Sequence, residues 1–330
     1  MPLVSETKRE VHTGAIEQLV YCHRRQGTIL FRESNGQLRV LLGKNASEGS
    51  PQFFAPYGIA VDQGRHGFWI SDKQANAVWF AKFSISDMGA WSYERFQFER
   101  FVHNAMRAPC MVDVHPSLGL LTACYGTTAE PGGLIRYDGN VWEDITVENF
   151  RDKITHCCWW PDGGYSYVTR SDSVLWHCEG FGAAPRALTL SGNNRMLSPI
   201  SGPLEKLRLR YVQGLRYSVH RDGLLIADAS LGAIYFVDLK NGSYFVVAGK
   251  PSITDSEQQA LLSTGRSDLW LGPIRGITED TLGRILILDG EQGFLYLLEN
   301  SGELKEIETF SRELSKGILG TGMVVVRSCV

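Results

Sequence analysis

The sequence has no long apolar run and no excess of either charge. None of the apolar runs in its 330 residues approaches the length of about 18 that a membrane-spanning helix needs. Lys and Arg total 33 against 36 Asp and Glu, and this near balance gives no overall attraction to phosphate backbones or anionic membranes. We therefore expect neither nucleic acid nor a membrane as a partner.

The seven cysteines are odd in number and include no C-x-x-C pair. This pattern argues against a zinc ribbon and against a complete disulfide framework, and it is typical of free thiols in a reducing compartment. The first 14 residues are polar and lack the apolar segment of a secretory signal. These features predict a cytoplasmic protein.

Three common catalytic fingerprints are also missing, namely the G-x-S-x-G elbow, the P-loop and the dinucleotide-binding glycine pattern. Hydrophobic residues make up 43% of the chain and include eight Trp, so there is ample material for a large core. The sequence is that of a globular protein whose chemistry must lie elsewhere than in these motifs.

A repeated unit is present instead. Residues 53–83, 213–239 and 272–299 share one order of features: an apolar run, a Gly or Asp turn, an apolar run ending in Asp, and a third apolar run. Weaker copies begin at Ala108 and Ile154. The five copies start near residues 55, 108, 154, 211 and 272, and this spacing is typical of propeller blades.

We predict an all-β, six-bladed β-propeller of four-stranded antiparallel blades, formed as a single domain by residues 1–330. The sixth blade combines residues 16–44 with residues 318–329, so that strands from both termini close the ring without a free sheet edge. Helices are expected to be few, with one helical turn in the connection at 251–267.

Two blade junctions carry a family resemblance. Residues 246–280 read VVAGKPSITDSEQQALLSTGRSDLWLGPIRGITED, and residues 41–72 read LLGKNASEGSPQFFAPYGIAVDQGRHGFWISD. Both resemble NHL repeats, which join two blades of a six-bladed propeller, and the fold is similar to that of lactonases and strictosidine-synthase-like proteins. The resemblance implies a propeller whose relatives include lyases, hydrolases and binding scaffolds, and the fold alone does not choose among these functions.

The predicted topology separates two ends of the ring. We call the end where the chain enters each innermost strand the mouth face, and the end with the turns from first to second strands the turn face. His66, His115 and His220 are expected on the turn face, where tight turns present no concave pocket. A small-molecule site is expected at the mouth of the central channel.

The expected site residues all belong to the mouth face. Those at the start of inner strands are Tyr57, Cys110, His156, Gln213 and Arg275, and those after second strands are His23, Asp72, Tyr125, Arg170, Asp228, Asp289 and Glu291.

Their roles are predicted from how each departs from the repeat. The recurring Asp72, Asp228 and Asp289 suit hydrogen bonds to backbone N–H groups in the next turn, or positioning of a bound partner. His156 and Tyr125 depart from the repeat and are the predicted acid/base residues.

Arg170 or Arg275 is expected to orient an anionic or carbonyl group. No cofactor is predicted. A divalent cation is left open, held by His23, His103 and His156 or by carboxylates from several blades.

Two functions follow. The preferred hypothesis is a cytosolic enzyme that acts on a small molecule at the channel mouth by acid/base or electrostatic catalysis, as a lyase, hydrolase or cyclase of specialised metabolism. The alternative is a non-catalytic NHL-type scaffold that binds a protein partner. An exposed apolar patch over a closed mouth favours the scaffold, and a polar pocket favours the enzyme.

Overall fold

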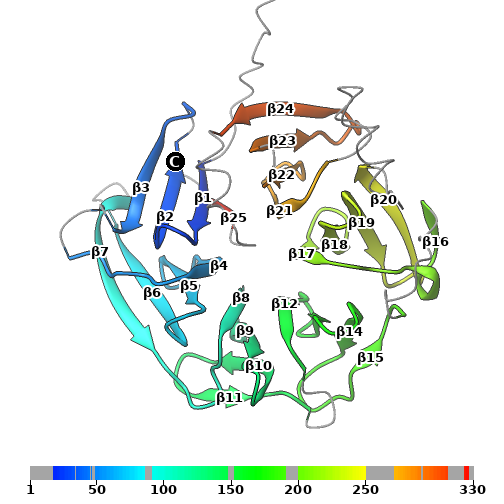
Figure 1. The fold of residues 1–330 in the computed structure, drawn as a ribbon, viewed down its shortest axis with the longest axis horizontal. Coiled ribbons are helices and arrows are strands. Elements are labelled where there is room, and N and C mark those ends of the chain that lie inside the picture. Colours follow the sequence, from blue (N-terminus) through cyan, green and yellow to red (C-terminus); the bar gives the residue numbers. More distant parts are fainter. Residues whose placement is uncertain are drawn as a thin grey trace, which may run out of the picture.

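The computed structural model describes most of the chain. The described residues are 18–33, 35–44, 46, 49–85, 91–147, 152–190, 200–249, 271–290, 293–310 and 323–326. They form a ring of six antiparallel sheets around a central axis, as predicted (Figure 1).

The first three blades are built from the N-terminal half of the chain, except that blade one takes its innermost strand from near the C-terminus. Blade one consists of β25 (Met323–Val326), β1 (Gln18–His23), β2 (Thr28–Arg32) and β3 (Leu38–Gly43). Blade two consists of β4 (Pro56–Asp62), β5 (Gly67–Asp72), β6 (Ala77–Ile85) and β7 (Trp91–Phe101). Blade three consists of β8 (Pro109–His115), β9 (Gly119–Gly126), β10 (Pro131–Tyr137) and β11 (Trp142–Asp144).

The remaining blades follow in chain order. Blade four consists of β12 (Ile154–Trp159), β13 (Tyr165–Thr169), β14 (Leu175–Cys178) and β15 (Arg186–Ala187). Blade five consists of β17 (Val212–Ser218), β18 (Gly223–Asp228), β19 (Ala233–Asp238) and β20 (Ser243–Gly249). Blade six consists of β21 (Ile274–Glu279), β22 (Ile285–Asp289), β23 (Phe294–Leu298) and β24 (Leu304–Thr309).

Blade five differs from the four-stranded prediction by one strand. The short β16 (Ser201–Pro203) pairs with β20 at its outer edge and leads into a single 3-10 turn, Leu204–Lys206. The helical turn predicted within 251–267 lies outside the described residues. The part of the chain that the structure describes holds no helix with the length and apolar character that crossing a bilayer requires.

The ring is closed by strands from opposite ends of the chain. β25 is the innermost strand of blade one, and it pairs antiparallel with β1 from Gln18 opposite Val326 to Tyr21 opposite Met323. The predicted closure of one blade by both termini is confirmed.

The hydrophobic core is divided among the interfaces between neighbouring blades. Six clusters of buried apolar residues are present among the described residues, and each joins one blade to its neighbour. Between blades four and five, for example, Trp160 and Val168 pack with Leu215 and Tyr235. Each blade is therefore held by apolar contacts with the blades on either side of it.

The inner strands share an irregularity close to the mouth face. In blades two to six, the register between the first and second strands shifts near the start of the inner strand. The positions skipped by the pairing are Tyr57 with Gly58, Cys110 with Met111, Thr155, Gln213 and Arg275. Such bulges re-aim side chains, and they are frequent beside binding sites.

Glycine within these bulges allows neighbouring inner strands to approach closely. A Cβ at Gly58 would collide with the backbone carbonyl oxygen of Cys110 and would lie 2.9 Å from the Cα of Met111. A Cβ at Gly214 would lie 2.7 Å from the Ile277 side chain. The ring diameter at the mouth therefore depends on the absence of a side chain at these positions.

Replacement of Gly58 tests this dependence. We expect Gly58→Ala to lower the free energy of unfolding by about 3 kcal/mol, because the added methyl group meets backbone atoms that cannot move aside easily. Urea unfolding measures the effect. Gly180→Ala is the matched control, because no heavy atom lies within 4 Å of a Cβ at Gly180. Equal stability of the two variants would contradict the packing described above.

Candidate functional site

The structure gathers eleven of the twelve predicted site residues at the inner-strand starts or second-strand ends of the mouth face. The antiparallel pairing of Pro56 with Asp72 and of Val212 with Asp228 places the start of an inner strand beside the end of the next strand. The twelfth residue, Glu291, lies outside the described residues.

The alignment of His156 with the other blades differs from the sequence-based one by a residue. The strand pairing aligns Thr155, not His156, with Tyr57, Cys110 and Gln213. His156 instead takes the position that is glycine in blades two, five and six. The inner strands of blades two to six share the register shift, but blade four lacks the glycine that marks this position in blades two, five and six.

His156 is consequently buried between inner strands, with none of its surface exposed. Neither ring nitrogen makes a hydrogen bond of normal geometry within the described part of the chain. The pKa of His156 is lowered to about 3, chiefly by burial and also by the charges of Arg216, Lys73 and Arg170, while the nearby Gln213 backbone acts in the opposite direction. The imidazole is therefore neutral at physiological pH, and its surroundings disfavour its protonation.

The recurring aspartates hold the turns of the mouth face. The Asp72 carboxylate accepts hydrogen bonds from the N–H groups of Phe54 at 2.8 Å and Ala55 at 2.9 Å. Asp228 does the same for Arg210 and Tyr211, at 2.6 and 3.2 Å, and burial raises its pKa. These two carboxylates therefore accept hydrogen bonds from backbone N–H groups, as the repeat predicts.

Three further predicted residues are buried close to these turns. Asp289 is 1% exposed and its carboxylate lies against Gly272, at a φ of 68°. His23 accepts a hydrogen bond from the Gln26 N–H through Nδ1, at 3.2 Å. Cys110 is fully buried, and burial raises its pKa while Lys73 acts to lower it.

One backbone hydrogen bond recurs in blades two to six and aligns the loops of the mouth face. A residue at the end of each second strand, or just after it, donates its N–H to the carbonyl oxygen of the residue just before the inner strand. Lys73, for example, donates to the Ala55 carbonyl oxygen at 3.0 Å. The equivalent donors are Lys73, Tyr125, Arg170, Ala229 and Gly290. Blades two to four therefore present large polar side chains where blades five and six present small residues.

The large side chains form a cluster of cations and aromatic rings. The Lys73 ammonium lies 3.9 Å from the ring centroid of Tyr125 and 5.2 Å from that of Tyr57. The ammonium of Lys153, which immediately precedes β12 of blade four, lies 5.6 Å from the centroid of the same Tyr125 ring. Cations over aromatic faces are attracted by the ring quadrupole, and the attraction is greater where water is excluded.

Two more arginines extend this group. Arg24 lies 5.8 Å from the Tyr57 ring centroid, and Arg170 lies 4.1 Å from that of Tyr211. We call the seven residues the mouth cluster: Arg24, Tyr57, Lys73, Tyr125, Lys153, Arg170 and Tyr211. Four residues of the cluster are not among the twelve sequence-predicted site residues: Arg24, Lys73, Lys153 and Tyr211. Arg24 and Lys73 each immediately follow a second strand, and Lys153 and Tyr211 each immediately precede an inner strand, so all four stand at recognisable places in the repeat.

Arg275 lies beside the cluster. Its side chain packs against Gly290, where any side chain would collide with it, and its Nε is buried without a hydrogen-bond partner in the described chain. Burial raises the pKa of Tyr57, and the charges of Arg24 and Arg275 act to lower it. The mouth therefore holds several cations in addition to the buried Asp72, Asp228 and Asp289.

Arg216 lies across the axis of the ring. From β17 its guanidinium reaches the Asp113 carboxylate of β8, 3.6 Å away, and the carbonyl oxygens of Ile59 in β4 and Met323 in β25, each at 3.4 Å. One side chain thus contacts three other inner strands. It separates the mouth face from the turn face at the centre of the molecule.

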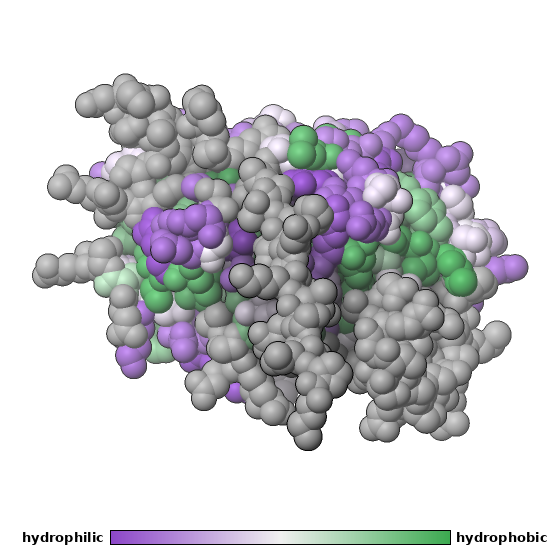
Figure 2. Space-filling model, turned by 90° about the horizontal axis from the view of Figure 1, so that it is seen from above, coloured by the Kyte–Doolittle hydropathy of each residue, from purple (hydrophilic) through white to green (hydrophobic). Residues whose placement is uncertain are grey.

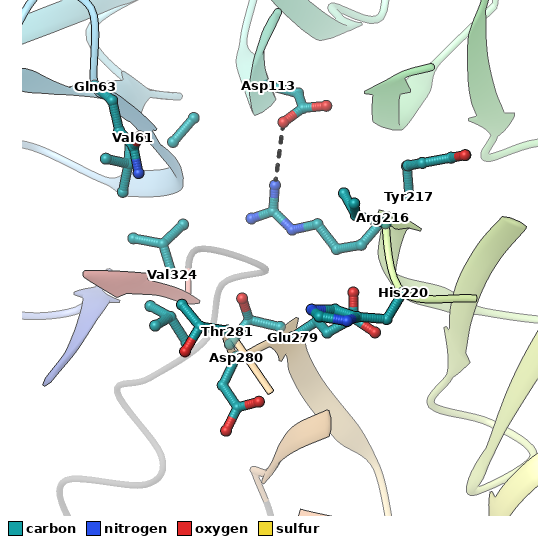
Figure 3. Close-up of a pocket in the computed structure, with 14 residues that line it drawn as sticks. Val61, Gln63, Asp113, Arg216, Tyr217, His220, Glu279, Asp280, Thr281 and Val324 are labelled. Atoms are coloured by element: carbon teal, nitrogen blue, oxygen red, sulfur yellow. Dashed lines mark ion pairs between the residues drawn. The ribbon is translucent and has the colours of Figure 1, made fainter. Parts of the chain in front are cut away.

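A cavity of about 300 Å³ opens on the turn face beneath Arg216 (Figure 3). Its lining comes from the ends of inner strands and from the turns that follow them, including His220. The expectation that the turn face has no concave pocket is therefore wrong. The turns themselves are short, but together with the strand ends they line a concave space.

Large exposed apolar residues do not gather in one place. They come from several blades: Phe54, Val102, Val141, Phe181, Leu190, Ile200, Val219, Phe245 and Leu282. On the edge of the ring seen in Figure 2, hydrophobic residues form separate groups between hydrophilic ones. Scattered apolar residues of this kind are normal for a protein surface.

Among the described residues, no group of three or more His, Cys, Asp or Glu side chains is placed to hold a metal ion. The divalent cation left open above stays a prediction.

Comparisons with known proteins give the fold. No protein-family model and no curated protein sequence matches the chain. Among solved structures, a nidogen/laminin complex contains a similar chain at 12% identity and a TM-score of 0.64, with 95% of this chain and 100% of that chain covered. Virginiamycin B lyase from Staphylococcus aureus is similar at 10% identity and a TM-score of 0.54, covering 89% and 81%.

This chain is a six-bladed β-propeller. A Bacteroides thetaiotaomicron protein of unknown function is also similar, with a TM-score of 0.58 at 10% identity, over 84% of this chain and 65% of that one. At these identities the likeness of the propeller to its neighbours establishes the fold alone. The NHL-repeat resemblance of the two junctions stays a prediction.

The buried His156 predicts a pH dependence of stability. The pKa of His156 is about 3 in the folded protein and 6.5 in the unfolded chain. Between pH 3 and pH 6.5 the unfolded chain therefore binds a proton that the folded chain does not. Stability therefore falls as pH drops below about 6.5. Relative to His156→Gln, the wild type should lose up to about 1.4 kcal/mol per pH unit, as measured by urea unfolding at pH values of about 7, 6 and 5. Parallel pH profiles of the two proteins would contradict this environment for His156.

Proposed function

We propose that the protein is an enzyme that binds a small anionic molecule at the mouth of its central channel. Five cations lie at this face: Arg24, Lys73, Lys153, Arg170 and Arg275. None of them forms an ion pair within the described residues. This observation carries the proposal, because cations without carboxylate partners are an arrangement that an anionic ligand stabilises, and all of the five except the exposed Arg170 are half-buried.

The shape of the cluster favours a planar or unsaturated anion. The rings of Tyr57, Tyr125 and Tyr211 lie next to the cations and offer apolar faces with polar hydroxyl ends. Arg170 is suited to hold a carboxylate or phosphate with two parallel hydrogen bonds, and Lys73 supplies a compact point charge between two rings.

A reaction of lyase, hydrolase or cyclase type fits these groups. Each involves a proton transfer and a transition state with negative charge on oxygen. Tyr125 is the proposed proton donor or acceptor at the ligand, and Lys73 and Arg170 stabilise developing negative charge. The fully buried His156, whose pKa is lowered to about 3, is a weak base, so no proton-transfer role is proposed for it. The lyase type is preferred.

Two neighbours provide precedents of opposite kinds. Virginiamycin B lyase is a propeller enzyme, and a variant of it with one histidine replaced by alanine, described as catalytically inactive, has been solved with quinupristin. The nidogen chain is found in a complex with laminin. The unpaired cations of the mouth cluster favour the enzyme over the scaffold for this chain.

The described cysteines support a cytoplasmic location for this enzyme. The six of them are free thiols and all are buried, so no disulfide stabilises the described part of the ring.

Substitution of Lys73 tests the proposal. Small carboxylates and phosphates are screened by thermal shift, and the best of them should stabilise the wild type by several degrees, because ligands that bind only the folded state raise Tm. Lys73→Met should reduce affinity at least about tenfold, since it removes the cation nearest two rings. Lys82→Met is the matched control and should bind as the wild type does, because Lys82 is an exposed lysine of β6 that lies opposite Gly67, at the turn-face end of blade two.

The proposal would be contradicted if no anion of the panel bound, or if Lys73→Met and Lys82→Met bound the hit equally well. A hit that instead gains affinity on loss of Lys73 would also exclude an anion site at the mouth.

A further inference from the structure

The cavity on the turn face is closed at its inner end by Arg216 and is separate from the mouth cluster. Ala60, Val61, Val219, Val324 and Val325 contribute an apolar wall from three blades. In Figure 3, Arg216 reaches from β17 into the space bounded by Asp113, Val61 and Val324. A volume of about 300 Å³ is at the lower end of the range of small-molecule sites.

The hydrogen-bonding capacity of the Arg216 guanidinium is only partly used. Its side chain is 13% exposed, yet its contacts to Asp113, Ile59 and Met323 are 3.4 to 3.6 Å long. Charge-assisted hydrogen bonds of a guanidinium are ordinarily about 2.7–2.9 Å. The guanidinium therefore keeps donor capacity for a closer and better aligned acceptor in the cavity.

The other charged groups of the lining are already paired. The Glu279 carboxylate accepts hydrogen bonds from Ser218 and Arg221, both at 2.7 Å. Asp280 pairs with Arg284 at 2.6 Å, and in Figure 3 its carboxylate points away from Arg216. Among the described residues that line the cavity, Arg216 is the only arginine or lysine.

Asp113 is a weak competitor for Arg216. Its Oδ2 accepts the Trp159 N–H at 2.8 Å, and burial raises its pKa. An incoming carboxylate placed for two parallel hydrogen bonds would hold the guanidinium better than a single oxygen 3.6 Å away does.

We propose that this cavity is a second binding site, which takes a small carboxylic acid with a short branched aliphatic body. The carboxylate binds Arg216, and the aliphatic body contacts Val61, Val324 and Val325. Thr278 and Gln63 at the same wall accept or donate further hydrogen bonds where the ligand carries a polar substituent. The site does not depend on the function proposed for the mouth.

The probes are chosen to separate charge from shape. Binding of 4-methylpentanoate, L-leucine and 3-methylbutylamine to the full chain is measured by isothermal titration calorimetry. The two acids share a carboxylate and a branched aliphatic chain, and they distinguish a plain carboxylic acid from an α-amino acid as the source of that chemistry. Saturable binding of either acid, with at least about tenfold weaker binding of the amine, is the expected result.

Two variants locate the binding. Arg216→Gln removes the guanidinium, and Val61→Phe fills the cavity without altering the charge; each should weaken binding of the better acid at least about tenfold. Arg39→Gln, an exposed arginine of blade one, is the control and should bind unchanged. If Arg216→Gln fails to fold because Asp113 loses its partner, Val61→Phe decides the question alone.

Failure of this proposal is distinguishable from failure of the mouth site. Absence of binding by both acids, or equal binding of the amine, overturns the second site. Loss of acid binding in Lys73→Met together with full binding in Val61→Phe also overturns it, because the acid would then occupy the mouth.

Discussion

The antiparallel ladder between β25 and β1 is the interaction on which the rest of the molecule depends, because it joins the two ends of the described chain within one blade. Without it, blade one would lose its innermost strand and the ring would have an open edge. The apolar clusters between blades one and two and between blades one and six both include residues of β25. Closure therefore fixes the ring, and the ring fixes the distance between opposite inner strands.

Around the central axis, the close approach of the inner strands limits which side chains each of them can carry. Gly58 and Gly214 allow neighbouring strands to approach, while His156 takes the equivalent position in blade four and is buried there. Arg216 occupies the centre and contacts the strands facing it. The result is two faces with one arginine between them: a mouth that holds the cluster of cations and aromatic rings, and a partly apolar cavity on the turn face.

The sequence was sufficient to predict the ring, because the repeat of turn and strand signals has a period that few other folds share. It was also sufficient for the backbone role of Asp72 and Asp228, since an Asp that recurs at one position suits a local hydrogen bond. It misaligned His156 by one residue because blade four lacks the glycine that marks this position in blades two, five and six. The cavity below Arg216 was beyond prediction, as it depends on one long side chain crossing the axis between blades that are far apart in the chain.

The most direct test of the central claim is an experimental electron-density map of the protein with the strongest small-anion ligand of the panel bound. The account predicts density at the mouth, with the acid group within hydrogen-bond distance of Lys73 or Arg170 and the body of the ligand against the rings of Tyr125 or Tyr211. A mouth without ligand density, with the same anion bound only to the outer surface of the blades, would contradict it.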